Sequence, residues 1–273
     1  MKSVHHASKK THGIDLTYLL PNEMLTYVAS FLAHDNRASC TFARVSRRFC
    51  GVVHDVFDQG PTFQHACRRG YIEIVQLLLE DGCVDPAARD NYAIQESSYY
   101  GHVEVVKLLL ADGHVDPLAN NNFAIRRSSQ EGHTDVVRLL LADGRADPTA
   151  DGNWAIRTSS HNGHADIVRL LLEDGRADPT ADNNFAIQWS CDGGHSEVVR
   201  LLLADGRADP TAYDNYAIRL SSMLGNAAVV KLLLADPRVD PTAWDNDAIK
   251  ISSSSGHAAV VKLLLADTRV RKN

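Results

Sequence analysis

Residues 132–162 read GHTDVVRLLLADGRADPTADGNWAIRTSSHN, and this stretch recurs along most of the chain. A new copy opens every 31 residues, at Gly70, Gly101, Gly132, Gly163, Gly194, Gly225 and Gly256. Six copies are complete and the seventh is shortened at the C-terminus. A fixed period between about 20 and 50 residues is typical of a solenoid, in which each unit buries its apolar face only against its neighbours.

Each copy predicts two helices. Apolar residues at i, i+3 and i+4, such as Val105, Leu108 and Leu109, lie on one face of the longer helix. A glycine ends this helix and a proline then turns the chain, because proline lacks a backbone donor. A polar loop precedes the shorter helix, in which Ile125 points to the core. We therefore predict an all-α fold of about seven helix pairs over residues 57–273, the first of them degenerate, with Phe63 at the isoleucine position.

The pattern of the longer helix, G-H-x-[ED]-V-V-[KR]-L-L-L, resembles the ankyrin repeat. The shorter helix departs from that family, since residues 216–222 read YAIRLSS where the family has T-P-L-H-x-A-A. The period is also shorter than the family's usual value of about 33 residues. The missing residues fall where ankyrin proteins build β-hairpin fingers. The resemblance implies an ankyrin-type solenoid with short fingers that binds other proteins.

A segment of different composition precedes the repeats. Residues 1–15 are polar and basic and are expected to form a disordered tail. Residues 16–56 predict a compact helical unit that begins at LPNEML, where the proline suits the first turn of a helix. A unit of this size is near the lower limit for a domain that folds alone. We expect it to need the array or a partner beside it.

This unit resembles an F-box, a motif that starts with L-P-x-E and ends with V-[CS]-[KR]-x-[WF]. The matching stretches are residues 20–23, which read LPNE, and residues 45–49, which read VSRRF. The resemblance implies docking to the S-phase-kinase-associated adaptor of a cullin–RING ubiquitin ligase through Leu20, Pro21, Glu23, Met24, Leu25, Val28, Leu32, Val45 and Phe49. The alternative is that these helices only cap the array, because terminal repeats need a cap. An F-box before a short-period array also resembles proteins of large DNA viruses of amoebae.

Composition narrows the class of protein. Residues 1–69 carry nine Lys and Arg against five Asp and Glu, whereas the remaining residues carry 19 against 29. The acidic array argues against nucleic acid as a partner, since phosphate binding needs a cationic surface. The apolar runs are too short to cross a bilayer, and residues 1–13 lack the apolar core of a secretory signal. The five cysteines form no C-x-x-C pair, which favours reduced thiols in an intracellular, cytoplasmic protein, the host cytoplasm if the source is a virus.

Neither of two polar columns predicts chemistry. One repeats a histidine after the opening glycine, at His102, His133, His164, His195 and His257. The other repeats an aspartate before proline, at Asp85, Asp116, Asp147, Asp178, Asp209 and Asp240, where a turn-capping role is expected. The sequence holds no metal-ligand spacing and no nucleophile or phosphate-binding motif. We therefore expect no catalytic residue, no metal, no cofactor and no enzymatic activity.

Two variable columns predict a binding surface for a client protein. Two residues after the invariant isoleucine the chain reads Glu96, Arg127, Thr158, Trp189, Leu220 and Ile251. The polar loop contributes Arg89, Asn120, Asp151, Asp182, Tyr213 and Trp244. Both columns become apolar or aromatic toward the C-terminus, and exposed aromatic patches mark binding sites. The predicted client-binding residues are Trp189, Tyr213, Leu220, Trp244, Ile251 and Arg127, although some of them would serve equally well as packing between repeats.

A third column is nearly always aromatic, and its constancy predicts a place in the core: Tyr92, Phe123, Trp154, Phe185 and Tyr216. The last helix, residues 259–265, is as apolar as the internal ones, so we expect it to fray or to be covered by a partner. The leading hypothesis is a substrate receptor of a cullin–RING ligase, with the adaptor and an unknown protein client as partners, no membrane or nucleic-acid partner, and a monomeric state outside the ligase. The alternative is an ankyrin scaffold or competitive inhibitor whose N-terminal helices only cap the array.

Overall fold

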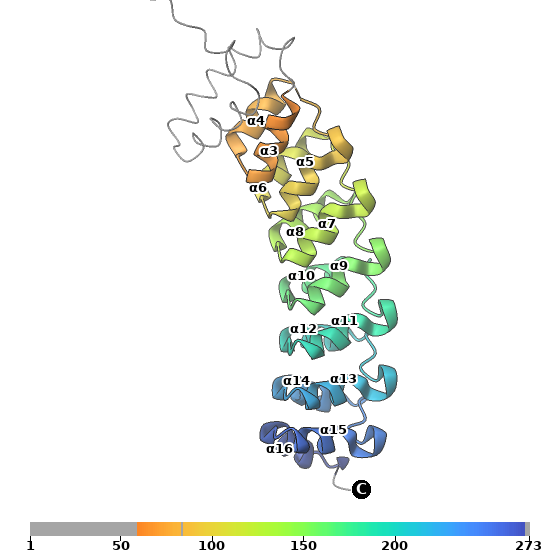
Figure 1. Ribbon diagram of the computed structural model, residues 1–273. Coiled ribbons are helices and arrows are strands. Elements are labelled where there is room, and N and C mark those ends of the chain that lie inside the picture. Colours follow the sequence, from red (N-terminus) through yellow and green to blue (C-terminus); the bar gives the residue numbers. More distant parts are fainter. Residues whose placement is uncertain (1–58, 83, 271–273) are drawn as a thin grey trace, which may run out of the picture.

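The computed structural model describes residues 59–82 and 84–270, in which every regular element is a helix. Fourteen helices follow one another as seven pairs (Figure 1). The first helices of the pairs are α3 (Gly60–Arg69), α5 (Ala88–Tyr99), α7 (Ala119–Glu131), α9 (Ala150–His161), α11 (Ala181–Asp192), α13 (Ala212–Met223) and α15 (Ala243–Ser254). The second helices are α4 (Ile72–Glu80), α6 (Val103–Asp112), α8 (Thr134–Asp143), α10 (Ala165–Asp174), α12 (Ser196–Asp205), α14 (Ala227–Ala235) and α16 (Ala258–Ala266). For these residues the predicted all-α solenoid is confirmed.

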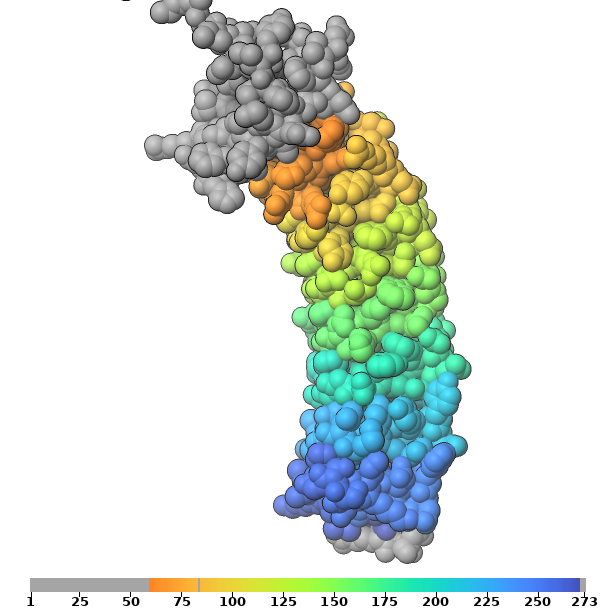
Figure 2. All heavy atoms as spheres, viewed as in Figure 1, coloured from red at the N-terminus to blue at the C-terminus, as the bar shows by residue number. Residues whose placement is uncertain are grey.

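The pairs stack in chain order into one elongated array (Figures 1 and 2). Each first helix packs on the first helices of the adjacent pairs, and each second helix packs on the adjacent second helices. A left-handed glycine separates the two helices of a pair, as at Gly132 with φ 87°, and another ends most of the second helices, as at Gly144 with φ 80°. Only glycine takes this conformation without steric cost, which explains why both positions repeat in the sequence.

Apolar side chains fill the space between the two layers of helices, in two clusters that meet at α10. The first helices contribute the isoleucine column, which is fully buried at Ile94, Ile125, Ile156, Ile187 and Ile218. The second helices contribute two valine-type positions and one leucine, such as Val136, Val137 and Leu140. Phe63 takes the isoleucine place in α3 and is buried, as predicted for a degenerate first repeat. Paired serines, such as Ser159 and Ser160, are also fully buried, because their small side chains let neighbouring helices approach closely.

Candidate functional site

The most unusual backbone in the array is a three-residue turn near the start of each first helix from α5 onward. These finger turns comprise residues 89–91, 120–122, 151–153, 182–184, 213–215 and 244–246, and every φ in them lies between 52° and 64°. Figure 1 shows them as short coils along one edge of the stack. The short fingers predicted from the sequence are therefore left-handed turns, and the described residues contain no β-hairpin.

Each finger turn is fastened to the next one. The third residue is always asparagine. In five repeats its side-chain oxygen accepts a hydrogen bond from the backbone N–H of the aspartate that lies four residues before the next finger turn, as from Asp147 to Asn122 at 2.8 Å. The aspartate carboxylate in turn accepts from a backbone N–H two residues on, as from Thr149 at 2.9 Å. This bond confirms the turn-capping role predicted for the aspartate column. The fingers are therefore held in place before any partner arrives.

The first residue of each finger turn shows a change of chemistry along the array. Asparagine and aspartate, which tolerate left-handed backbone, occupy the three central repeats. Tyr213 and Trp244 occupy the last two, and their side chains are 60% and 64% exposed. A bulky residue in this conformation costs about 1–2 kcal/mol. Backbone strain of this kind is characteristic of functional positions, where another requirement outweighs stability.

A second column fixes the orientation of these finger residues. In three repeats an arginine follows the invariant isoleucine and contacts the first finger residue of the next repeat. Arg126 Nη1 lies 2.6 Å from a carboxylate oxygen of Asp151, and Arg157 Nη2 lies 2.5 Å from one of Asp182. At the C-terminal end the arginine remains but the acid is replaced, so the guanidinium carbon of Arg219 lies 4.0 Å from the centroid of the Trp244 ring. There the guanidinium makes a cation–π contact with the finger residue and forms its ion pair with Asp247, at 2.8 Å.

The outward face of the first helices also becomes apolar toward the C-terminus. On α13, Tyr216 and Met223 lie on one helix face and are 39% and 40% exposed. On α11, the Trp189 ring is 39% exposed and packs against Phe185, with ring centroids 5.1 Å apart. In the first three full repeats the position of Trp189 holds Glu96, Arg127 and Thr158, whereas the position of Tyr216 is aromatic in those repeats also. We use the name C-terminal aromatic surface for Trp189, Tyr213, Tyr216, Met223 and Trp244.

The six predicted client-binding residues differ in how far their side chains are exposed. Trp189, Tyr213 and Trp244 are exposed, which agrees with an accessible surface. Leu220 is only 8% exposed, so the expectation that it forms part of an exposed patch is wrong for that residue, because its branched side chain fits between the helices. Ile251 is half-buried.

Arg127 lies apart from the C-terminal aromatic surface. Its guanidinium carbon is 5.5 Å from the Phe123 ring centroid and 6.0 Å from that of Trp154, in the preceding half of the array. Sequence reasoning missed Tyr216 and Met223. They lie four residues before and three residues after Leu220, and this helical spacing was the available signal.

The aromatic column does not lie in the core, contrary to the prediction. Tyr92, Phe123, Trp154 and Phe185 are half-buried and Tyr216 is exposed. Arginines cover part of several rings, as with Arg157, whose guanidinium carbon is 4.8 Å from the Phe185 centroid. The column is constant because each ring packs at the edge between adjacent first helices. A flat ring at this place can also accept a guanidinium group over one of its faces.

The histidine column joins adjacent repeats. His133 Nε2 lies 2.9 Å from the backbone oxygen of Tyr99, and the same bond recurs from His102, His164, His195 and His257. Asn226 takes the histidine place in one repeat and donates to the backbone oxygen of Cys191 at 3.0 Å. These contacts account for the histidines as structural residues.

A second inter-repeat contact was not anticipated from the sequence. Arg145 forms a two-pronged ion pair with Asp143 and donates to the backbone oxygen of Val115 in the preceding repeat at 3.0 Å. Four later arginines repeat the contact, at Arg176, Arg207, Arg238 and Arg269. Hydrogen bonds from Arg145 hold the pKa of the Asp143 carboxyl below its usual range. The spacing D-x-R, which all five arginines share, was the signal for this contact.

The two cysteine thiols among the described residues are inaccessible. Cys67 and Cys191 are free and buried, and burial raises the pKa of the Cys191 thiol to about 12. Within residues 59–82 and 84–270, no three His, Cys, Asp or Glu side chains gather as a set of metal ligands. No helix in those ranges has both the length and the apolar run that crossing a bilayer needs.

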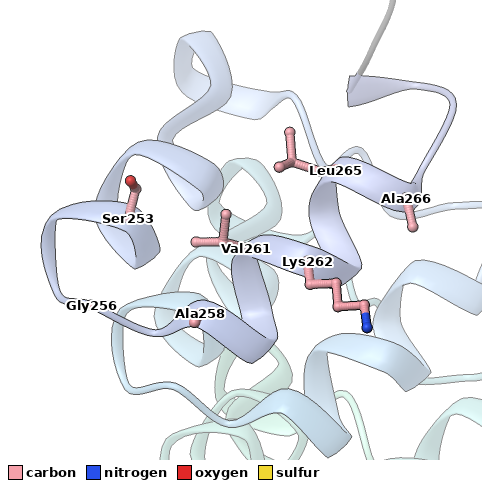
Figure 3. A pocket seen from close by; sticks show the side chains of 7 residues that line it. All are labelled: Ser253, Gly256, Ala258, Val261, Lys262, Leu265 and Ala266. Carbon is pink, nitrogen blue, oxygen red and sulfur yellow. The ribbon is translucent and has the colours of Figure 1, made fainter.

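An open depression of about 620 Å³ lies at the C-terminal end of the array (Figure 3). It is lined by Ser253, Gly256, Ala258, Val261, Lys262, Leu265 and Ala266. The corresponding face of α14, whose sequence AAVVKLLLA is identical to that of α16, is covered by the last pair. The depression is therefore the stacking face of the last repeat that the structure describes.

The predicted adaptor-docking residues lie outside the described part of the chain. This applies to Leu20, Pro21, Glu23, Met24, Leu25, Val28, Leu32, Val45 and Phe49. The boundaries proposed at residues 15 and 56 also lie outside it. These assignments remain predictions.

Comparison with known proteins agrees with the repeat geometry. The family model described as ankyrin repeats (3 copies) matches three overlapping stretches, residues 4–121, 63–152 and 122–214. Together they cover residues 4–214, well over half of the chain. No curated protein shows a significant match to this sequence.

Proposed function

The chain belongs to the ankyrin-repeat family, and on this premise we propose that it is a non-enzymatic scaffold whose C-terminal aromatic surface binds a client protein. The observation that carries the proposal is the pair Tyr213 and Trp244, two exposed aromatic side chains on strained backbone. More than half of each side chain is exposed, and the left-handed backbone costs about 1–2 kcal/mol at each position. Binding of a partner protein would explain why Tyr and Trp occupy these positions, since both are preferred anchors of protein interfaces.

The rigidity of this surface supports the proposal. Asn215 Oδ1 accepts from the backbone N–H of Asp240 at 2.7 Å, and Trp244 packs on Arg219. The finger backbone and the Trp244 ring therefore lose little further conformational freedom when a partner binds, and such preorganisation favours affinity. Trp189, Tyr216 and Met223 extend the surface along α11 and α13.

The finer proposal is that the protein is a substrate receptor of a cullin–RING ubiquitin ligase. It is favoured by the F-box-like segment, with LPNE at residues 20–23 and VSRRF at residues 45–49. The segment would dock the adaptor, and the array would hold the client near the ubiquitin-conjugating enzyme, in the cytoplasm. The receptor would act by raising the local concentration of client. The other candidate is a scaffold or competitive inhibitor in which residues 16–56 only cap the array.

The two candidates are separated by direct binding of the full chain to the purified adaptor. The test variant is Leu20→Ala/Pro21→Ala, and the matched control is Tyr213→Asn/Trp244→Asn, which leaves the N-terminal segment unchanged. Tight binding by the wild type and the control, with loss in the test variant, supports the receptor. A folded wild-type chain that does not bind the adaptor leaves the scaffold as the function.

The client surface is tested separately with phage-displayed random peptides selected on the full chain. We expect the recovered peptides to lose binding to Tyr213→Asn/Trp244→Asn. Both substitutions place asparagine where the chain itself uses Asn120, so the fold is kept. Peptides that bind this variant as well as the wild type would show that the client surface lies elsewhere.

A further inference from the structure

We propose that the C-terminal aromatic surface takes a basic, extended peptide segment, one of whose arginine side chains stacks on the Tyr213 ring beside Asp214. This inference rests on the proposed function and adds the chemical class of the partner. Its support comes from the charge of the surface, from the exposure of its carboxylates and from a contact that the chain makes within itself.

Charge changes along the array on the side that carries the fingers. Residues 178–192, 209–223 and 240–254 of the last three full repeats contain eight carboxylates and two cationic side chains. The corresponding residues 85–99, 116–130 and 147–161 contain six carboxylates and four cationic side chains. The formal charge is therefore −6 in the C-terminal half and −2 in the other half, so negative charge and exposed aromatic rings concentrate in the same repeats.

The carboxylates of the last two fingers project into solvent. The Asp245 side chain is 88% exposed and pairs with the exposed Lys250. Asp214 is exposed and forms no ion pair with a Lys or Arg of the described residues; its contact is with the indole N–H of Trp244 at 3.4 Å. Asp214 therefore offers a carboxylate to a cationic partner without first breaking an ion pair.

The array itself demonstrates how these rings accept a cation. The guanidinium carbon of Arg219 lies 4.0 Å from the centroid of the Trp244 ring in the next repeat, while its Nε pairs with the Asp247 carboxylate at 2.8 Å. The residue in the same relation to Tyr213 is Gln188, which is neutral and donates instead to the backbone oxygen of Asn183 at 2.8 Å. No cationic side chain of the described residues lies over the Tyr213 ring. An arginine from a partner can take the place that Arg219 occupies one repeat later.

The neighbouring surface favours an extended peptide over a compact cationic ligand. Tyr213 and Trp244 are equivalent positions of adjacent repeats, and Trp189, Tyr216 and Met223 are exposed on α11 and α13 of the same part of the array. A segment that alternates basic and apolar residues would place its cations at the fingers and its apolar side chains on α11 and α13.

The probe is a twelve-residue peptide of alternating arginine and leucine with a fluorescent label, titrated into the full chain by anisotropy. The comparison peptides replace arginine with glutamate or with glutamine. We expect the arginine peptide to bind at least tenfold more tightly than either, and its affinity to fall as salt rises, since exposed charges are screened. Equal affinity for the three peptides, or no binding of the arginine peptide, would overturn the inference.

Two variants with matched controls locate the site. Gln188→Arg places an internal guanidinium over Tyr213 and is expected to weaken the arginine peptide about tenfold, whereas Gln95→Arg, the same change in the first full repeat, leaves affinity unchanged. Asp214→Asn/Asp245→Asn weakens binding, whereas Asp135→Asn/Asp166→Asn, on exposed acids of α8 and α10, does not. Equal effects of test and control variants would reduce the binding to general attraction by an acidic protein and overturn the inference.

The outcomes also separate this inference from the proposed function. Peptides selected from a random library that need Tyr213 and Trp244 but contain no excess of Lys or Arg would leave the client surface intact and reject its basic specificity. Binding of every peptide without regard to Tyr213 and Trp244 would reject both.

Discussion

A Cβ atom on Gly132 would lie 2.7 Å from Cε1 of His164, the histidine of the next repeat. The contact recurs at Gly70, Gly101, Gly163 and Gly225, each against the histidine of the following repeat. The histidine ring is fixed there because Nε2 of His164 is hydrogen-bonded to the backbone oxygen of Gln130 at 3.0 Å. This packing sets the spacing between successive repeats and explains why both residues are repeated.

The first prediction concerns this contact. Gly132→Ala should lower the free energy of unfolding by about 2–3 kcal/mol, because left-handed strain of about 1–2 kcal/mol is joined by loss of the His164 hydrogen bond, worth about 1 kcal/mol. The control is Gly144→Ala, which has a similar φ of 80° and no atom within 4 Å of the added carbon. Urea unfolding that gives equal losses for the two variants would contradict the role of the histidine.

The second prediction concerns the buried serines. The hydroxyl groups of Ser98, Ser129, Ser160 and Ser222 have no hydrogen-bond partner within the described residues. An unpaired buried hydroxyl costs about 1–3 kcal/mol. Ser160→Ala should therefore raise the free energy of unfolding by about 1 kcal/mol. The equivalent position of the next repeat holds Cys191, which lacks the hydroxyl group.

The neighbouring serine provides the control for this measurement. Ser159 is equally buried but donates to the backbone oxygen of Ile156 at 3.2 Å. Ser159→Ala should lower stability by about 1 kcal/mol, because a hydrogen bond is lost. Thermal unfolding in which both alanine variants move the midpoint in the same direction would refute the distinction.

The third prediction concerns acid. Arginines hold the pKa values of Asp143, Asp174, Asp236 and Asp267 below their usual range. Their contribution to stability is therefore complete above the ordinary carboxyl pKa of about 4 and is lost as the pH falls through the lowered values. Asp143→Asn/Asp174→Asn should lower stability at pH 7 by about 1 kcal/mol in all, a small value because the arginines are partly solvated.

The same variant should be less sensitive to acid than the wild type between pH 5 and pH 2, since two of the titrating groups are gone. The control Asp135→Asn/Asp166→Asn removes two acids whose side chains are 72% exposed, so its pH dependence should parallel the wild type. Unfolding by denaturant across this pH range measures both. If the free energy of unfolding changes with pH in parallel for all three proteins, the Asp–Arg pairs are not the acid-sensitive contacts.

The fourth prediction uses two helices of identical sequence. Both α14 and α16 read AAVVKLLLA, so the intrinsic exchange rates of their amides match. Val230 is fully buried beneath the last pair, whereas Val261, its counterpart in α16, is only half-buried (Figure 3). Hydrogen exchange should be at least tenfold faster at residues 260–264 than at 229–233. Equal protection that depends on protein concentration would instead indicate that a second molecule covers the end.

Some of this structure was accessible from the sequence because it depends on contacts within one repeat. The helix pairs, their glycine stops and the aspartate caps all follow from local spacing. The finger turns do not. Residues 182–184 read DNN, which indicates only a polar loop, whereas their left-handed conformation is held by a bond from Asp209 to Asn184, 25 residues along the chain.

The candidate surface was predicted in outline for the same reason. The two variable columns become aromatic toward the C-terminus, and this identifies Trp189, Tyr213 and Trp244. The place of a residue in the repeat does not, however, determine how deeply its side chain is buried. Leu220 is buried because a branched aliphatic chain fits where the flat Trp189 ring, one repeat earlier, remains partly exposed. Tyr216 was placed in the core because its column is constant, although contacts at the edge between helices preserve an aromatic residue equally well.

At Tyr213 we expect opposite effects of one substitution on stability and on peptide binding. Tyr213→Asn should raise the free energy of unfolding by about 1 kcal/mol, because asparagine tolerates left-handed backbone and the tyrosine ring, 60% exposed, contributes little burial. The reverse change in the same column, Asn120→Tyr, should lower it by a similar amount, and Tyr213→Phe should leave it unchanged. Chemical unfolding measures all three. The stabilised variant should also lose peptide binding, as expected where activity is maintained at the expense of stability. A destabilised Tyr213→Asn would mean that the ring supports the fold, and the strain would then no longer indicate a binding site.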